Sequence, residues 1–300
     1  MSMEVKHISV CVCTFKRPDL LRRLLNKLDE QQTKGLFSYS VVVADNDALQ
    51  SARQVVRDFS AVSSIQTIYC VEPEQNIALA RNKALENATG DFIAYIDDDE
   101  VPENDWLYNL FKTCNAYGVD GVLGPVKPSF ECVPPPWVIK GRFFERPAYD
   151  TGYKLACSET RTGNVLLKRS ILNENKNWFR AKFGTGSEDV DFFRRMMETG
   201  KVFVWCNDAA VYESIPLQRC KRSYLLKMAL LRGGNSLKHQ GGRFRSIIKS
   251  FIAVPVYGCA LPFLFIAGDH HFMKYLIKFC DHAGKLLSLI GINPVETRNF

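Results

Sequence analysis

Four consecutive acidic residues at positions 97–100 (Asp-Asp-Asp-Glu) follow directly after the apolar run at residues 93–96. Adjacent carboxylates repel one another, so folding alone gives little reason to place them at the end of a buried strand. A divalent cation would give such a reason, because Mg²⁺ is usually held by one or two carboxylates together with substrate phosphates. The alternative is a solvated acidic turn that caps a helix starting at residues 103–106.

A second acidic cluster follows a glycine-rich segment at residues 183–187. We expect a helix that begins near Glu188 and continues to Gly200. Carboxylates in the first turn of a helix are favoured by its dipole, which is a sufficient structural explanation for the cluster. The same interactions would keep Asp189 ionised, and an ionised carboxylate beside a glycine loop is suited to act as a general base toward a hydroxyl.

Polar residues also follow two other predicted strands, at residues 45–47 (Asp-Asn-Asp) and 13–17 (Cys-Thr-Phe-Lys-Arg). Together with the acidic run, they would form a nucleotide pocket in which Asp45 or Asn46 hydrogen-bonds a base or ribose. Asp and Asn also favour turns, so each residue alone could be explained by turn formation. The chain has no G-x-x-x-x-G-K-[ST] phosphate loop and no dinucleotide-binding glycine pattern, which argues against a P-loop enzyme or a dehydrogenase.

These residues lie within a regular alternation of strand and helix patterns in the first part of the chain. The predicted strands are residues 7–15, 41–44, 65–71 and 91–96, and the predicted helices are residues 18–31, 48–59 and 77–87. This order predicts an α/β fold with a mainly parallel, Rossmann-like sheet flanked by helices on both faces. Such sheets bind ligands at the carboxyl ends of their strands, where the polar residues lie.

The 300 residues suit one large α/β domain or a domain with an appendage. Ten cysteines are scattered without a C-x-x-C pair, and no secretory signal pattern precedes the first strand. We therefore expect a cytoplasmic protein with reduced thiols.

Basic residues are concentrated between positions 214 and 250, where nine Lys and Arg occur without any Asp or Glu. An uncharged stretch of 17 residues at positions 251–267 follows, interrupted by Pro255, Gly258 and Pro262. A basic segment can bind nucleic acid, phosphorylated ligands or an anionic membrane, and the apolar stretch favours the membrane surface over nucleic acid. We favour a dip into one leaflet; a buried helical hairpin and a membrane-spanning helix are the alternatives.

The ordered motifs of residues 8–213 resemble glycosyltransferase family 2, whose members have the GT-A fold. The motifs are Cys13-Thr14-Phe15-Lys16-Arg17, Ala44-Asp45-Asn46, Gln75-Asn76-Ile77-Ala78-Leu79-Ala80-Arg81-Asn82, Ile96-Asp97-Asp98-Asp99, Thr162-Gly163-Asn164 and Gly186-Ser187-Glu188-Asp189. No single motif is specific, but their order and spacing together are. The resemblance implies transfer of a sugar from a nucleotide donor, with inversion at the anomeric carbon and Mn²⁺ or Mg²⁺ as cofactor.

The resemblance also implies roles for individual residues. Asp189 would be the general base. The donor-binding residues would be Thr14, Arg17, Asp45, Asn46, Arg81, Asp97 and Asp98, with Asp99 as a metal ligand. Many GT-A enzymes supply a histidine to the metal at the position near Glu213, so either Glu213 replaces it or that ligand is absent.

The acceptor site is less specified by the sequence. Asn164 and Glu188, which lie in the family-like motifs, are candidates for it, and Trp137 could stack on a sugar or instead cover the core. A membrane-seeking tail suggests a glycan or lipid-linked oligosaccharide acceptor at the inner face of the membrane, with a UDP-sugar as donor, as in bacterial surface polysaccharide synthesis. A sugar nucleotidyltransferase and a non-catalytic glycan- or membrane-binding scaffold are the alternative functions.

The predicted domains follow from these assignments. Residues 1–213 would form the GT-A catalytic domain, with a nucleotide-sugar-binding half at 1–125 and an acceptor-binding half at 126–213. Residues 214–300 would form a basic and hydrophobic helical appendage that associates peripherally with the membrane.

Overall fold

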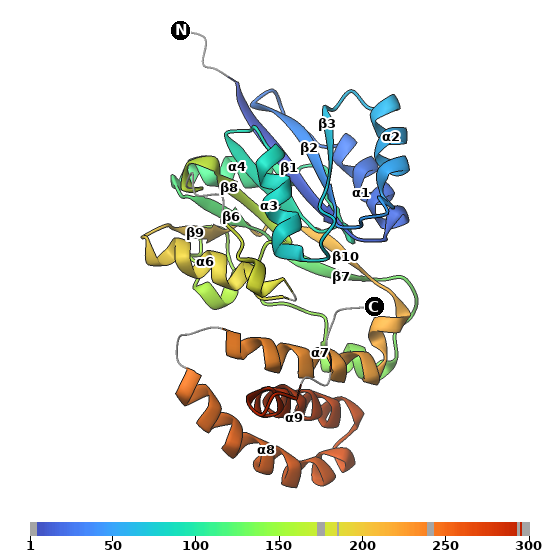
Figure 1. Cartoon of the computed structure of the whole chain (residues 1–300), viewed down its shortest axis with the longest axis vertical. Coiled ribbons are helices and arrows are strands. Elements are labelled where there is room, and N and C mark those ends of the chain that lie inside the picture. The colour runs from blue at the N-terminus through green and yellow to red at the C-terminus, as the bar shows by residue number, and fades with distance from the viewer. Residues whose placement is uncertain (1–4, 173–177, 185, 239–242, 293–294, 296–300) are drawn as a thin grey trace. The chain divides into compact units, whose positions relative to one another are not determined.

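The computed structural model describes residues 5–172, 178–184, 186–238, 243–292 and 295 (Figure 1). The chain divides into two compact units. The first unit consists of Met1–Lys127, Arg146–Gly184 and Glu188–Ser214, and the second unit consists of Pro128–Glu145, Thr185–Ser187 and Ile215–Phe300. The segment Pro128–Glu145, inside the predicted acceptor-binding half, thus groups with the C-terminal region.

The first unit is built on a seven-stranded sheet with the order β3-β2-β1-β4-β8-β6-β9. These strands are β1 (Lys6–Thr14), β2 (Phe37–Asp45), β3 (Thr67–Val71), β4 (Phe92–Ile96), β6 (Gly121–Leu123), β8 (Asn164–Lys168) and β9 (Phe203–Trp205). Only β8 runs antiparallel to its neighbours, β4 and β6. The predicted α/β fold with a mainly parallel sheet is therefore confirmed.

A smaller sheet has the order β5-β10-β7, with β5 (Glu100–Pro102), β10 (Val211–Ile215) and β7 (Val126–Phe130). The helices of the first unit are α1 (Pro18–Asp29), α2 (Arg53–Val62), α3 (Ile77–Asn87), α4 (Trp106–Tyr117) and α6 (Glu188–Glu198). The predicted helix at 77–87 is confirmed with the same bounds, and the helix predicted from residue 188 begins there.

Buried apolar residues explain the central strands and α1. Residues 41–44 of β2 are all apolar and inaccessible to solvent, as is typical of a parallel strand covered on both faces. Leu21, Leu24, Leu25 and Leu28 form a fully buried stripe on α1, which starts with a proline whose missing N–H is not needed there.

The second predicted helix begins later than expected. The sequence predicted a helix from Ala48, whereas α2 begins at Arg53. The Asp45 carboxylate accepts hydrogen bonds from the backbone N–H groups of Asp47 (3.1 Å) and Ala52 (2.8 Å). These bonds hold residues 47–52 in a turn that competes with the helix.

The second unit is helical, with α5 (Pro136–Gly141), α7 (Arg222–Asn235), α8 (Arg243–Ile266) and α9 (Asp269–Leu289). Within this unit α9 packs against both α7 and α8 (Figure 1). The uncharged 17-residue stretch lies almost entirely within one helix of 24 residues that contains Pro255 and Pro262.

Candidate functional site

The strand order of the main sheet reverses beside β1. The chain proceeds from β1 outward to β2 and β3 and then returns to the other side of β1 as β4. Crevices for ligands form at such a point, outside the carboxyl ends of the strands. Thr14 at the end of β1 is in register with Asp45 at the end of β2, and the acidic run leaves the end of β4.

Two acids of the run are tied to the end of β1. The Thr14 hydroxyl donates to Asp98 Oδ2 over 2.8 Å, and Arg17 Nη1 lies 3.1 Å from Asp98 Oδ1 and 3.3 Å from Asp99 Oδ2. Burial raises the pKa of Asp98 to about 7, an effect that the Arg17 guanidinium opposes. The structure therefore brings together four residues that the sequence analysis placed in one site.

Asp97 is the most accessible carboxylate of the run, with 46% of its side chain exposed. Its Oδ1 lies 3.5 Å from Nη2 of Arg81, which is itself buried on α3. The other terminal nitrogen of Arg81 forms an ion pair with Glu188 Oε1 in the first turn of α6. One arginine thus joins the acidic run to the helix that carries the candidate base.

The fourth acid, Glu100, is almost fully buried on β5 directly opposite Glu213 of β10. Burial and the charges of Asp97, Asp99 and Glu213 raise the pKa of Glu100 well above its ordinary value. Glu213 is paired with Arg146 over 2.6 Å. Because like charges on opposite strand positions are unfavourable, this arrangement is one that a bound cation would stabilise.

The segment at residues 161–163 lies against the acids. A Cβ atom on Gly163 would be 2.8 Å from Glu100 Oε1 and 3.0 Å from Asp97 Oδ2, so only glycine fits without displacing a carboxylate. Burial lowers the pKa of Arg161 to about 10, with Arg146 acting in the same direction and Glu100 opposing it. Within the described residues, Arg161 Nε and Thr162 Oγ1 are buried without a hydrogen-bond partner. Buried unpaired donors of this kind are candidates for ligand contacts.

The sequence analysis did not single out Arg146, Arg161 or the individual role of Glu100. Arg161 directly precedes the Thr162-Gly163-Asn164 motif, so its position was available as a signal. Arg146 has no such signal, because its pairing with Glu213 joins residues far apart in sequence.

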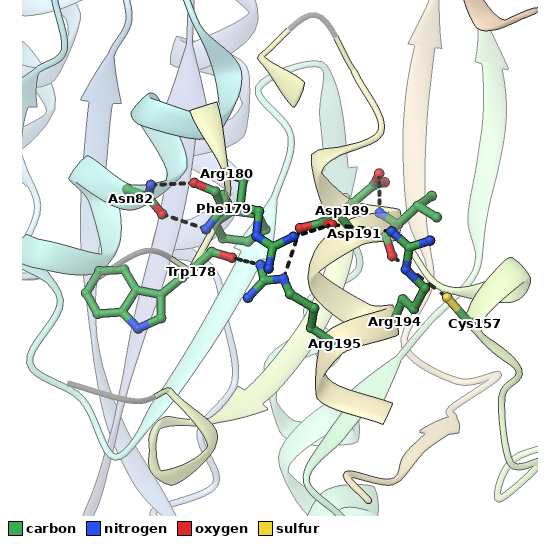
Figure 2. A network of polar contacts seen from close by, with 10 residues as sticks. Asn82, Cys157, Trp178, Phe179, Arg180, Asp189, Asp191, Arg194 and Arg195 are labelled. Atoms are coloured by element: carbon green, nitrogen blue, oxygen red, sulfur yellow. Dashed lines mark hydrogen bonds and ion pairs between the residues drawn. The ribbon is translucent and has the colours of Figure 1, made fainter. Parts of the chain in front are cut away.

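Two aspartates at the start of α6 have different environments (Figure 2). Asp191 is inaccessible to solvent and lies within ion-pair distance of Arg180 (3.4 Å), Arg194 (3.3 Å) and Arg195 (2.9 Å). Asp189 is half-buried, and its Oδ1 accepts from the Val190 N–H over 2.8 Å. Asp191 therefore forms ion pairs within the fold, whereas the Asp189 carboxylate can accept further hydrogen bonds from a ligand.

Two asparagines, Asn76 at the N-cap of α3 and Asn82 within α3, hold the segment that precedes α6. Asn76 caps α3 through its Oδ1 and donates from Nδ2 to the carbonyl of Ala181 over 3.0 Å. Asn82 exchanges two hydrogen bonds with the backbone of Phe179, of 2.7 and 2.9 Å (Figure 2). The motif at residues 75–82 therefore positions the chain leading to α6.

The predicted base-binding residues have well-defined structural partners. Asp45 is fully buried and, besides its two backbone donors, accepts from the Tyr69 hydroxyl over 2.8 Å. Asn46 donates to the carbonyls of Glu72 (2.9 Å) and Glu74 (2.5 Å) and accepts from the N–H of Asn76 (2.9 Å). Both side chains shape the strand ends, and a direct contact of either with a nucleotide stays a prediction.

The three predicted acceptor residues lie in three different settings. Asn164 is fully buried: it accepts from Trp106 Nε1 (2.8 Å) and donates to the carbonyls of Pro125 (3.1 Å) and Ala209 (2.7 Å), so its amide is occupied within the fold. Trp137 belongs to the second unit, where its ring packs edge-on against Phe143. Glu188 is buried beside Arg81, and its Oε2 has no hydrogen-bond partner among the described residues.

The carboxylates of the acidic run could also bind a cation. Across the described part of the chain, no three His, Cys, Asp or Glu side chains converge as a metal cage. Asp97 and Asp99 nevertheless offer oxygen ligands beside a repulsive group of carboxylates. This donor set fits a Mg²⁺ or Mn²⁺ ion shared with ligand phosphates, which needs only one or two protein carboxylates.

Comparison with known proteins agrees with this fold. The mannosyltransferase PcManGT from Pyrobaculum calidifontis, solved with GDP-Man and Mn²⁺, superposes with a TM-score of 0.64 at 18% identity, covering 95% of this chain and 88% of that chain. TarS 1-349 of S. aureus, solved with UDP-GlcNAc, gives a TM-score of 0.56 at 14% identity over 95% of this chain and 92% of that chain. The chain spans 55% of a longer TarS structure. The fold is GT-A.

Sequence comparison identifies the family. The profile of glycosyl transferase family 2 matches residues 9–175. The succinoglycan biosynthesis protein ExoM of Rhizobium meliloti (strain 1021) is 32% identical over 306 residues, covering 99% of this chain and 97% of ExoM. The chain belongs to glycosyl transferase family 2, as its motifs predicted.

Proposed function

We propose that this protein is a metal-dependent, inverting glycosyltransferase that moves a sugar from a UDP-sugar to a hydroxyl group of a glycan or lipid-linked oligosaccharide. The observation that supports this best is the Arg81 bridge, because it links Asp97 of the acidic run to Glu188, the neighbour of Asp189. The similarity to ExoM over nearly the whole chain supports a role in the synthesis of a bacterial surface polysaccharide.

The donor would bind at the carboxyl ends of β1, β2 and β4. Seven residues are proposed to contact it: Thr14, Arg17, Asp45, Asn46, Arg81, Asp97 and Asp98. Asp99 and Glu213 are proposed to hold Mn²⁺ or Mg²⁺, which would supply Lewis-acid stabilisation of the departing diphosphate when bound. Arg161 is proposed to add a fixed positive charge on the same side, since its Nε is buried and unpaired within the described residues.

Asp189 would remove the proton from the acceptor hydroxyl. The hydroxyl oxygen would then form a bond to the anomeric carbon while the bond from that carbon to the diphosphate oxygen breaks. A single displacement of this kind inverts the configuration and requires no nucleophile from the protein. Asp189 suits the role because it lies in the first turn of α6 and its side chain is half-accessible.

Glu188 is proposed to contact the acceptor, and Trp137 of the second unit is proposed separately as a residue that stacks on a sugar. The Glu188 Oε2 atom is buried and unpaired in the described structure, so it can accept a hydrogen bond from a sugar hydroxyl. We leave Asn164 out of direct acceptor contact, because the fold already uses its amide. A lipid-linked acceptor would place the protein in the cytoplasm, peripherally at the inner face of the membrane.

Incubation of the purified protein with a panel of nucleotide sugars and Mn²⁺ tests this proposal. We expect thermal stabilisation and slow, Mn²⁺-dependent hydrolysis of one nucleotide sugar, with release of nucleoside diphosphate. Once an acceptor is found, NMR of the product should show inverted anomeric configuration. Release of pyrophosphate from a nucleoside triphosphate and a sugar phosphate would instead identify a nucleotidyltransferase, and retention of configuration would exclude the single displacement.

A further inference from the structure

One face of α8 exposes a continuous apolar stripe. The exposed residues recur every three or four positions along the whole helix, as expected for a single helical face. The stripe consists of Phe244, Ile248, Phe251, Ile252, Pro255, Val256, Cys259, Pro262, Phe263 and Ile266. The segment Phe244–Ile266 has a mean hydropathy of 1.8, yet only 6% of its most apolar part is buried. A patch of this length is unusual on a soluble surface.

The other side of α8 is covered by α9 along its length. Near one end of the pair, the Phe265 and Phe272 rings pack edge to face with centroids 5.5 Å apart. Toward the other end, Ser250 Oγ hydrogen-bonds His282 Nδ1 over 2.9 Å, and Lys285 donates to Ser246 Oγ over 2.6 Å. The helices α8 and α9 therefore pack antiparallel to each other along their length.

Close packing against α7 fixes α9 in turn. A Cβ atom on Gly284 of α9 would lie 2.8 Å from Leu230 Cα of α7, so the two backbones touch. The Arg232 guanidinium binds both carboxylate oxygens of Asp281 at 2.8 Å. The three helices thus form a preassembled support that presents the stripe (Figure 1).

The charged residues of α8 itself have one sign. No Asp or Glu occurs between positions 243 and 267, and the exposed residues Arg245 and Lys249 lie on the first turns of α8. A second copy of the chain on this face would bring two such basic segments together. A lipid surface that combines acyl chains with negative headgroups instead matches both the apolar stripe and the basic residues.

We propose that α8 docks in the plane of an anionic lipid bilayer, with the stripe among the acyl chains and the basic residues at the phosphates. At 24 residues and about 1.5 Å per residue, α8 is long enough to span a bilayer. A spanning α8 would, however, draw α9 into the hydrocarbon with its five charged residues Asp269, Lys274, Lys278, Asp281 and Lys285.

Flotation of the full chain with vesicles tests the docking. We expect binding to phosphatidylcholine vesicles that contain phosphatidylglycerol, weaker binding to pure phosphatidylcholine, and a loss of the difference at high salt. The double variant Phe251→Asp/Phe263→Asp should lower the partition coefficient by roughly a hundredfold or more. Val133→Asp is the matched control, because Val133 is 94% exposed in the same unit but lies outside α8.

Unchanged binding of the double variant, or no binding of the wild type to any vesicle, would overturn the proposal. So would a lipid-free dimer in light scattering that the double variant abolishes, since it would assign the stripe to a second copy. Circular dichroism of the double variant checks that α8 still folds. The assay uses no donor or acceptor, so its failure leaves the proposed sugar transfer untouched, and failure of transfer leaves the docking untouched.

Thiol labelling distinguishes the in-plane from the spanning position. The comparison uses Arg245→Cys and Ala267→Cys, two exposed positions near the ends of α8 that lie outside the stripe, in a background in which the exposed Cys132 and Cys259 are changed to serine. Both introduced thiols should react with a membrane-impermeant reagent added outside the vesicles, because an in-plane helix keeps both ends on one side. Protection of Ala267→Cys alone, relieved by detergent, would establish a span and overturn the in-plane position.

Discussion

Charged side chains are buried at the carboxyl edge of the main sheet, whereas apolar side chains are exposed along α8. Asp98, Asp99 and Glu100 each expose less than a tenth of their surface, while Phe263 exposes 75%. Both regions depart from the usual distribution of polar and apolar residues. Only in the first region is the cost offset by partners within the described protein. There, Arg17 pairs with Asp98 and Asp99, while Arg81 and Arg146 pair with the neighbouring acids Asp97 and Glu213.

The difference indicates what each region binds. The acids at the sheet edge remain mutually repulsive despite their arginine partners, which suits a small polar ligand and a cation. The stripe on α8 has no partner in the described part of the chain and extends along a whole helix, which suits an extended apolar phase.

The largest effect is expected for Asp189→Asn. Loss of a general base should lower kcat on the order of a hundredfold or more, while the affinity for the donor changes little. Turnover assays and calorimetry with the donor measure the two quantities. Near-normal turnover would move the base to another residue, and Glu188 would be the first to examine.

Asp191→Asn provides the contrast on the same helix. Removing a buried charge that three arginines surround should destabilise the fold by about 2 kcal/mol. Chemical unfolding would show a lower midpoint for this variant and an almost unchanged one for Asp189→Asn. The reverse pattern would contradict the assignment of the two aspartates.

Asp97→Ala and Asp99→Ala should each weaken Mn²⁺-dependent binding of UDP. With one carboxylate fewer, the cation and the diphosphate are less well held, and we expect a loss in affinity on the order of tenfold. Asp58→Ala is the control, because Asp58 is a half-exposed acid on α2. Undiminished affinity of Asp99→Ala in calorimetry with Mn²⁺ would exclude Asp99 as a metal ligand, and undiminished affinity of Asp97→Ala would exclude Asp97 as a donor contact.

The sequence predicted the elements of residues 7–96 because their signals are local. The leucine spacing of α1, for example, lies within the helix that it defines. The acidic run was recognised for the same reason. Its position at a strand end required only the alternation of apolar runs and helices.

Other features depend on contacts that local patterns do not encode. Arg146 meets Glu213 across 67 positions of sequence, so no spacing rule could pair them. Asp189 and Asp191 are equivalent as acids in a first helical turn, and only the arginines packed around Asp191 separate their roles. The length of α8 was also underestimated, because its prolines lie on the exposed face, where the carbonyls that they leave unbonded can reach solvent.

In the second unit, Gly284→Ala should destabilise the support beneath the stripe. The added Cβ would meet the Leu230 backbone, so α7 and α9 must separate, at a cost of about 1–3 kcal/mol. Gly258→Ala is the matched control on α8, where the nearest atom to the new Cβ is Phe279 Cε2 at 3.8 Å. Gly258→Ala should be neutral or slightly stabilising, and equal effects of the two variants on chemical unfolding would contradict the close packing of α7 and α9.

The smallest expected effect concerns His282, which joins α9 to α8 through Ser250. Burial lowers the pKa of His282 below 6.5, with Lys285 and Lys249 acting in the same direction and Asp281 opposing them. The charged and titratable groups around it are Lys249 and Tyr257 on α8, Asp281 and Lys285 on α9, and Arg232 on α7, which pairs with Asp281.

Below pH 6.5 the unfolded chain binds a proton at His282 that the folded chain binds less readily. The contribution of this residue to stability is therefore complete above that pH and is lost as the pH falls through and below it. His282→Gln should make the melting temperature less dependent on pH in that window, while leaving the dependence at higher pH unchanged. Identical profiles for the two proteins would mean that His282 titrates equally in the folded and unfolded chain, and that the contact between α8 and α9 is insensitive to its charge.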